Sequence, residues 1–146
     1  MDIKKKINYW VSAGTALGLY RDGDYIKGDT DLDIAMVWEP GLERKICDLI
    51  GGEVIRTAYE NGKPMQIAMI KEGVIVDIYF HHRVGEEIEN HSQSGWTRMR
   101  ANICTDPKWM KTKYGLLPIP KEAYFEIRYG DDWMIPQNKK PKFYEV

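Results

Sequence analysis

Four acidic residues form the densest group in this sequence that can carry chemistry. Asp29, Asp31 and Asp33 stand at every second position of one segment, and Asp77 is a lone carboxylate inside an otherwise apolar run. Carboxylate oxygens suit hard cations such as Mg²⁺ and Mn²⁺, which hold substrate phosphates while keeping several of their waters. A buried charge such as that of Asp77 also needs a partner. The pattern therefore predicts a metal-assisted phosphoryl or nucleotidyl transfer site.

Gly14 and Thr15 suit the binding of a phosphate group at this site. Gly14 has no side chain, so a phosphate can approach the backbone closely. Thr15 offers a hydroxyl and an amide at the expected start of a helix, where the helix dipole favours anions. Both residues are therefore expected to contact phosphate.

Other interpretations explain these motifs less well. A calcium-binding EF-hand loop beginning at Asp29 needs Gly at its sixth position and Glu at its twelfth, where this chain has Ile34 and Pro40. No GxxxxGK[ST] segment indicates a P-loop. A solvent-facing strand explains alternating acids, but it does not explain Asp77 in apolar surroundings.

Strands and short helices are expected to position these residues. Alternation puts Asp31 and Asp33 on one strand face, and it places Asp77 on the same face as Ile75 and Tyr79. The patterns predict strands over 9–13, 32–38, 53–59, 65–71 and 74–80, the last three antiparallel, and helices over 15–21, 42–50 and 121–130. The stretch 81–114 shows no clear periodicity. The fold class is therefore α/β, in one domain over 1–146.

Composition narrows the classes of protein to which this chain can belong. Its 146 residues are 43% hydrophobic, which suits one core, and 21 Lys and Arg against 22 Asp and Glu leave no overall positive field for stable nucleic-acid binding. No apolar run approaches a membrane span, and the N-terminus lacks the apolar part of a signal peptide. Cys47 and Cys104 have no CxxC spacing. We expect a cytoplasmic protein with reduced thiols.

Two motifs lie near opposite ends of the chain. Residues 14–18 read Gly-Thr-Ala-Leu-Gly and are followed by Arg21 and by Asp-Leu-Asp at 31–33, while 129–136 read Tyr-Gly-Asp-Asp-Trp-Met-Ile-Pro. In type and order they resemble the Gly-Thr-x-Leu-Gly, Arg, Asp-hydrophobic-Asp and Tyr-Gly-x-x-Trp-x-x-Pro pattern of the LicD family.

This resemblance implies both a fold and an activity. The fold is the nucleotidyltransferase type, an α+β domain with a mixed, mostly antiparallel sheet flanked by helices. The activity is Mg²⁺- or Mn²⁺-dependent transfer of phosphocholine or a similar phospho-group from a nucleotide-diphosphate donor to a sugar hydroxyl.

The resemblance also implies roles for individual residues. Asp31 and Asp33 hold the metal, and Asp77 matches a third acid that completes the metal site or deprotonates the acceptor hydroxyl. Gly14 and Thr15 meet the donor phosphate. Arg21 is expected to clamp phosphate because its planar fork pairs with phosphate oxygens, and Asp29 is expected in the phosphate site beside the metal ligands rather than among them.

Two rival functions use the same residues. The first is nucleotidyl transfer, which releases pyrophosphate where phospho-group transfer releases a nucleoside monophosphate. The second is a catalytically silent domain that binds nucleotides or partner proteins.

Two aromatic side chains have alternative interpretations of their own. His81 is either a base or phosphate ligand on the acidic face or a structural residue at a strand end, and Trp133 either stacks on a nucleobase or choline or belongs to the core.

Overall fold

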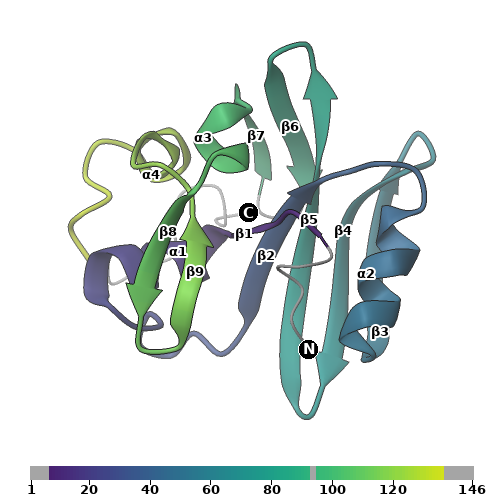
Figure 1. Ribbon diagram of the computed structural model, residues 1–146, viewed down its shortest axis with the longest axis horizontal. Helices are drawn as coiled ribbons and strands as arrows, with labels where there is room; N and C mark the ends of the chain where they lie inside the picture. Colours follow the sequence, from purple (N-terminus) through teal and green to yellow (C-terminus); the bar gives the residue numbers. More distant parts are fainter. Residues whose placement is uncertain (1–6, 93–94, 137–146) are drawn as a thin grey trace.

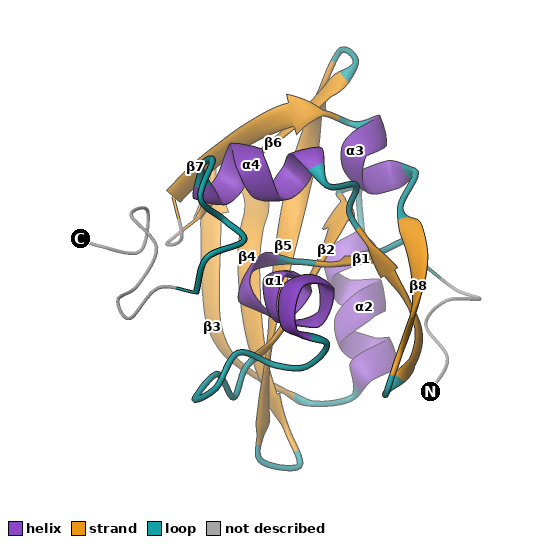
Figure 2. Cartoon of the chain, turned by 90° about the vertical axis from the view of Figure 1, so that its left-hand side faces the viewer, coloured by secondary structure: helices purple, strands orange, loops and turns teal. Residues whose placement is uncertain are grey.

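A seven-stranded sheet runs through the molecule and has helices on both faces (Figures 1 and 2). The structure is a computed structural model that describes residues 7–92 and 95–136. In chain order its elements are β1 (Trp10–Val11), α1 (Ala13–Asp22), β2 (Leu32–Val37), α2 (Leu42–Ile50), β3 (Glu53–Glu60), β4 (Lys63–Lys71), β5 (Val74–Val84), β6 (Glu87–Ser92), β7 (Gly95–Arg100), α3 (Asn102–Thr105), β8 (Lys108–Thr112), β9 (Gly115–Ile119) and α4 (Ala123–Tyr129).

The sheet is mixed but mostly antiparallel, as the resemblance implied. Its main path runs β1-β2-β5-β4-β3, and β6 and β7 continue from β5 as an antiparallel extension. Only the pairing of β2 with β5 is parallel among the described strands. A second sheet consists of β8 and β9. The predicted class, an α+β domain with a mixed sheet between helices, is confirmed.

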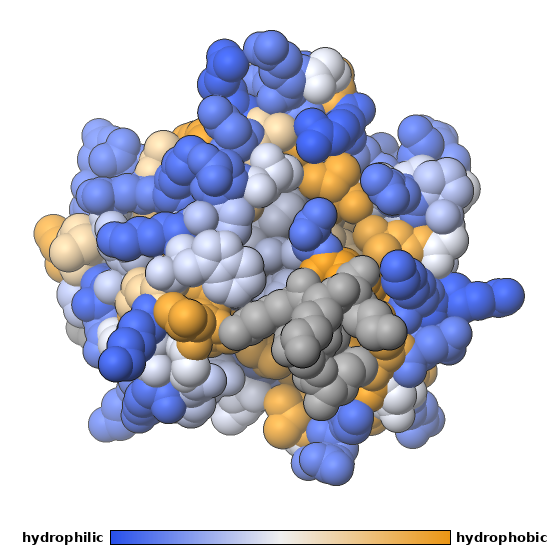
Figure 3. Space-filling view, in the orientation of Figure 1, coloured by the Kyte–Doolittle hydropathy of each residue, from blue (hydrophilic) through white to orange (hydrophobic). Residues whose placement is uncertain are grey.

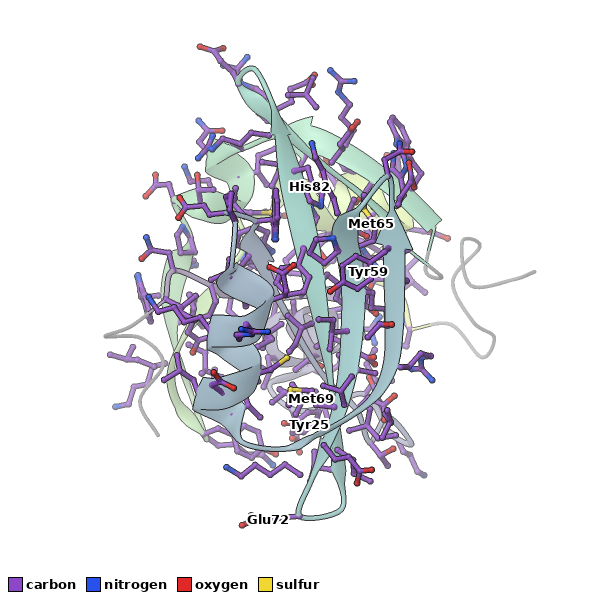
Figure 4. The ribbon with its side chains drawn as sticks, turned by 90° about the vertical axis from the view of Figure 1, so that its right-hand side faces the viewer. Tyr25, Tyr59, Met65, Met69, Glu72 and His82 are labelled. Atoms are coloured by element: carbon purple, nitrogen blue, oxygen red, sulfur yellow. The ribbon has the colours of Figure 1, made fainter. Side chains whose placement is uncertain are left out.

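Two apolar layers fill the space on either side of the sheet. Helix α2 covers one face, where Ile46 and Ile50 pack on side chains of β2, β4 and β5 such as Ile78. Figure 4 shows α2 in front of these strands, with Tyr59, Met65 and His82 grouped near one end of the sheet. The opposite face carries α1, α4 and β9, whose core includes Leu17, Phe125 and Ile119. The residues on this second face are the ones that build the candidate site.

Several local predictions are confirmed by these elements. Apolar residues at helical spacing form α2, which ends at Gly51 in the left-handed conformation with a φ of 72°. Asn61 and Gly62 join β3 to β4 as the expected hairpin, with φ values of 51° and 77°. The three strands β3, β4 and β5 are antiparallel neighbours, and Gly130 ends α4 as expected.

The structure also differs from the predicted elements. Helix α1 begins at Ala13, so Gly14 lies inside its first turn and does not form a separate turn before it. The unassigned stretch after residue 80 contains the end of β5, the β6–β7 hairpin, α3 and β8. Cys47 and Cys104 are free thiols, as predicted.

The described surface is mixed in character. On the face shown in Figure 3, hydrophilic side chains occupy most of the outline, and apolar side chains lie nearer its centre. No helix in the ranges 7–92 and 95–136 is long and apolar enough to cross a membrane.

Candidate functional site

Asp33 and Asp77 lie next to each other on the two parallel strands. In the β2–β5 ladder Asp33 is the direct partner of Asp77. Paired residues of neighbouring strands point to the same face, and both are almost completely buried, at 7% and 5% exposure. The fold therefore brings together two acids that are far apart in the sequence.

The first turn of α1 holds Asp33 through Thr15. The Thr15 backbone N–H and hydroxyl lie 3.4 and 3.2 Å from Asp33 Oδ2, and the hydroxyl oxygen accepts a 2.9 Å hydrogen bond from the Asp33 N–H. Thr15 is fully buried. In this structure the groups expected to meet phosphate thus position a carboxylate, and contact between Thr15 and a donor phosphate stays a prediction.

Asp29 and Asp31 belong to the loop that leads into β2, which begins at Leu32, so the prediction that Asp31 and Asp33 share one strand face was wrong. Asp29 Oδ1 accepts a 3.3 Å hydrogen bond from the Asp31 N–H, and the Asp31 carbonyl oxygen lies 3.2 Å from the Thr15 hydroxyl. A Cβ added to Gly14 would lie 2.9 Å from Asp29 Oδ2 and 3.9 Å from Asp33 Oδ2. Gly14 therefore lets the carboxylates approach the helix backbone closely.

Two residues that no motif indicated contact Asp77 from the side of β5 opposite to β2. Gln66 Nε2 on β4 donates a 3.2 Å hydrogen bond to Asp77 Oδ1, and Arg56 Nη2 on β3 lies 3.5 Å from the same oxygen. Gln66 is buried, and its own Oε1 has no hydrogen-bond partner. A polar residue within the apolar run of β4 was the sequence feature that could have pointed to Gln66.

Burial, and after it the repulsion of neighbouring acids, raises the pKa of Asp33, Asp77 and Asp29. Burial, followed by the charges of Asp77 and Asp29, raises the pKa of Asp33 to about 7, against the opposing hydrogen bonds from Thr15. Burial also raises the pKa of Asp77, assisted by the charge of Asp31 and opposed by Gln66 and Arg56. Burial and the Asp31 charge raise the pKa of Asp29. Such a crowded group of carboxylates is one that a cation stabilises.

The donor chemistry fits Mg²⁺ or Mn²⁺ on these grounds. Within the described residues, no three His, Cys, Asp or Glu side chains are arranged closely enough to hold a metal ion by themselves. Mg²⁺ does not require such a cage, because proteins usually bind it through one or two carboxylates together with waters and substrate phosphates. The adjacent pair Asp33 and Asp77 offers this smaller donor set.

Helix α4 supports the start of α1 through Tyr124. The fully buried Tyr124 hydroxyl accepts a 2.8 Å hydrogen bond from the Ala13 N–H and lies 2.9 Å from Ser12 Oγ. Ala13 has a φ of 49°, a backbone conformation that residues other than glycine rarely adopt. Tyr124 therefore fixes the backbone that leads into the Gly14-Thr15 turn, a role that no motif indicated.

Three other candidates lie in different surroundings. Arg21 donates to the Asp22 carboxylate at 2.9 Å and to the Trp133 carbonyl oxygen at 3.4 Å, and its role as a phosphate clamp stays a prediction. His81 packs against Trp10, and burial lowers its pKa to about 3. Trp133 stacks on Phe125 at 5.0 Å between ring centroids. His81 and Trp133 are thus core residues.

Comparison with known proteins gives one family. The description LicD/FKTN/FKRP, nucleotidyltransferase domain, matches residues 6–128, a range that includes the first motif and Asp77 and ends just before the second motif. A search of the curated proteins finds no match to the chain. With most of its length matched and the acids of both segments inside the match, the chain belongs to the LicD family of nucleotidyltransferase-domain proteins, which indicates a transferase of the phosphotransferase type.

Proposed function

We propose that this protein transfers a phospho-group from a nucleoside-diphosphate-linked donor to a hydroxyl of a sugar or glycan, with Mg²⁺ or Mn²⁺. The observation that carries this proposal is the direct pairing of Asp33 with Asp77 on parallel strands, beneath the first turn of α1. The family match supports the class of reaction.

Asp33 and Asp77 would hold the cation together with waters and donor phosphates, and Asp31 is the further ligand that the motif predicts. When bound, such an ion neutralises charge on the donor phosphates and so stabilises the transition state of phosphoryl transfer. Thr15 keeps the Asp33 carboxylate oriented, and Asp29 orders the backbone of Asp31. The chain thereby holds its acids in place before the donor arrives.

The reaction exchanges one phosphorus–oxygen bond for another. The acceptor hydroxyl oxygen forms a bond to the phosphorus of the transferred group, and the bond from that phosphorus to the bridging oxygen of the diphosphate breaks. The leaving group is a nucleoside monophosphate. The hydroxyl proton passes to a base, the role that Asp77 takes as the alternative to serving as a metal ligand.

Product analysis with candidate donors tests this proposal. A thermal-shift panel of CDP-, UDP- and GDP-linked donors with Mg²⁺ or Mn²⁺ comes first, since a ligand at a hundred times its dissociation constant adds about 2.7 kcal/mol to the free energy of unfolding. The stabilising donor is then incubated with sugar acceptors. Release of the monophosphate supports the proposal, whereas release of pyrophosphate from a nucleoside triphosphate indicates nucleotidyl transfer.

Two conservative variants test the metal ligands. Asp31→Asn and Asp33→Asn each remove a charged oxygen ligand without changing side-chain volume, so we expect both to abolish transfer and to retain the fold by circular dichroism. Turnover within about threefold of wild type in both would overturn the assignment. Metal titration without turnover under any donor would instead favour a silent binding domain.

A further inference from the structure

Arg56 reaches the carboxylate site along a single row of residues that crosses four strands. Asp33 on β2 pairs with Asp77 on β5, Asp77 pairs with Ala68 on β4, and Ala68 pairs with Arg56 on β3. Paired side chains share a face. Because Ala68 is small, the long Arg56 side chain passes over it to Asp77 Oδ1 at 3.5 Å.

A local irregularity in β3 turns Arg56 towards this face. Val54 pairs with Met69 and Arg56 pairs with Ala68, so β3 carries one residue, Ile55, more than β4 between the two pairs. A second shift between Ala58 and Tyr59 ends this segment. β-bulges of this kind redirect side chains and occur next to active sites.

The face that Arg56 would otherwise have occupied is apolar. Without the extra residue, Arg56 would oppose Ile67, whose side chain lies in the core beneath α2. The bulge therefore places a guanidinium beside the carboxylates at a position where a regular ladder would have directed it to the other side of the sheet.

Arg56 is also accessible, unlike the carboxylate that it contacts. Its side chain is 48% exposed, whereas that of Asp77 is 8% exposed. Figure 2 shows α1 in front of the central strands, with β3 at the outer edge of the sheet. The guanidinium thus stands at the rim of the site, where it can contact a bound ligand.

Charge balance shows which kind of ligand suits this position. Among the ion pairs between described residues, the Arg56–Asp77 pair is the one that involves a carboxylate of the site, while Arg21 pairs with Asp22. A divalent cation beside Asp33 and Asp77 takes over the neutralisation of Asp77. The planar fork of an arginine released in this way matches the oxygens of a phosphate.

We propose that Arg56 leaves Asp77 and binds a phosphate of the nucleotide donor when a divalent cation occupies the carboxylate site. This inference rests on the proposed function, and it assigns the binding of a donor phosphate to the Arg56 guanidinium on β3. A role for Arg56 in neutralising Asp77 alone is the alternative that an experiment must separate from it.

Isothermal titration of wild type, Arg56→Gln and Arg56→Lys separates the two roles. The titrants are Mg²⁺ alone, and then CDP, UDP and GDP at saturating Mg²⁺. Arg56→Gln removes the positive guanidinium beside the carboxylates, so we expect its Mg²⁺ affinity to be unchanged or higher. Loss of a charge-assisted phosphate contact weakens binding of the preferred diphosphate by at least about tenfold, and Arg56→Lys recovers part of this loss.

Arg98→Gln is the matched control. Arg98 on β7 is likewise a partly exposed strand arginine, paired with Glu87 at 2.8 Å, and β6 separates its strand from β5. We expect its Mg²⁺ and diphosphate affinities to equal those of wild type.

The outcomes distinguish failure of this inference from failure of the proposed function. Diphosphate affinity within about twofold of wild type in Arg56→Gln overturns the role of Arg56 alone. If wild type binds Mg²⁺ but none of the three diphosphates, the proposed function and the inference are both overturned.

Discussion

Asp33 is the residue whose environment differs most from that of an ordinary surface carboxylate. Its pKa of about 7, against an ordinary value of 3.8, means that the folded protein holds the proton more tightly than the unfolded chain does. Stability without metal therefore falls as pH rises from 3.8 to about 7 and then levels off. The corresponding contribution is roughly 4 kcal/mol.

Replacing this residue by a neutral isostere removes the penalty. We expect Asp33→Asn to unfold at higher denaturant concentration than wild type at about pH 8 and to lose this advantage at about pH 5. Asn retains an oxygen that can accept the hydrogen bonds from Thr15. Urea denaturation of metal-free protein at both pH values measures the difference. An equal difference at both would mean that Asp33 is already ionised at the lower pH.

Some residues of the site could be predicted from the sequence and others could not, for chemical reasons. Asp77 was expected to need a partner because a charge in an apolar strand is costly, and Gln66 and Arg56 supply it. Arg56 gave no such indication, because an exposed arginine on a strand looks like any surface residue until a bulge sets its direction. The sequence did not indicate Tyr124 either, because its role depends on a contact with Ala13, which is distant in the chain.

At the scale of the elements, α1 uses its two glycines for different purposes. A Cβ on Gly14 would meet the Asp29 carboxylate at 2.9 Å, whereas a Cβ on Gly18 would lie 2.5 Å from the backbone oxygen of Asp24 and 2.8 Å from the Ile26 nitrogen. A carboxylate can rotate away, but a packed backbone must shift as a whole. The same substitution therefore has different consequences at the two positions.

We expect Gly14→Ala to change the free energy of unfolding by less than about 1 kcal/mol. Alanine stabilises a helix relative to glycine, and this gain offsets the cost of moving the Asp29 side chain. Its Mg²⁺ affinity should fall. Gly18→Ala should lower the free energy of unfolding by about 1–3 kcal/mol, a typical cost of overpacking. Denaturation and metal titration of both variants check this, and equal destabilisation would show that Asp29 cannot move.

The junction of α4 with α1 offers a second test at this scale. Tyr124→Phe keeps the ring but leaves the buried Ala13 N–H without its acceptor, so we expect a loss of about 1–3 kcal/mol. Tyr20→Phe is the control, because its hydroxyl makes only an exposed 3.5 Å contact with Glu122, and a change within about 0.5 kcal/mol is expected. A loss in Tyr124→Phe no greater than in the control would contradict the role of Tyr124 in fixing the Ala13 backbone.

Elements with strong local patterns were predicted, and those without them were not. Helix α2 and the β3–β4 hairpin follow from apolar spacing and an Asn-Gly turn. In the β6–β7 hairpin the buried positions include Asn90 and Thr97, so the polar and apolar alternation is obscured. Asn90 is tolerated there because its amide donates 2.8 Å hydrogen bonds to the carbonyl oxygens of Met65 and Phe80.

At the scale of the whole molecule, two separate chain segments supply the acids. One segment contains α1, the loop of Asp29 and the start of β2, and the other is β5. The sequence identified both segments and the mixed α+β class, but pattern alone did not give the register that sets Asp33 opposite Asp77. That register depends on the packing of both faces of the sheet, which is a property of the complete fold.

The parallel pairing of β2 with β5 has a consequence for the order of folding. Parallel strands need a crossover, and here it contains α2, β3 and β4, so β3, β4 and β5 can pair locally before β2 joins them. The carboxylate site is then completed late. Stopped-flow chevron measurements should show that Mg²⁺ slows unfolding and leaves the refolding rate unchanged, because a site absent from the transition state affects only the unfolding limb. Faster refolding with Mg²⁺ would place the β2–β5 pairing in the folding nucleus instead.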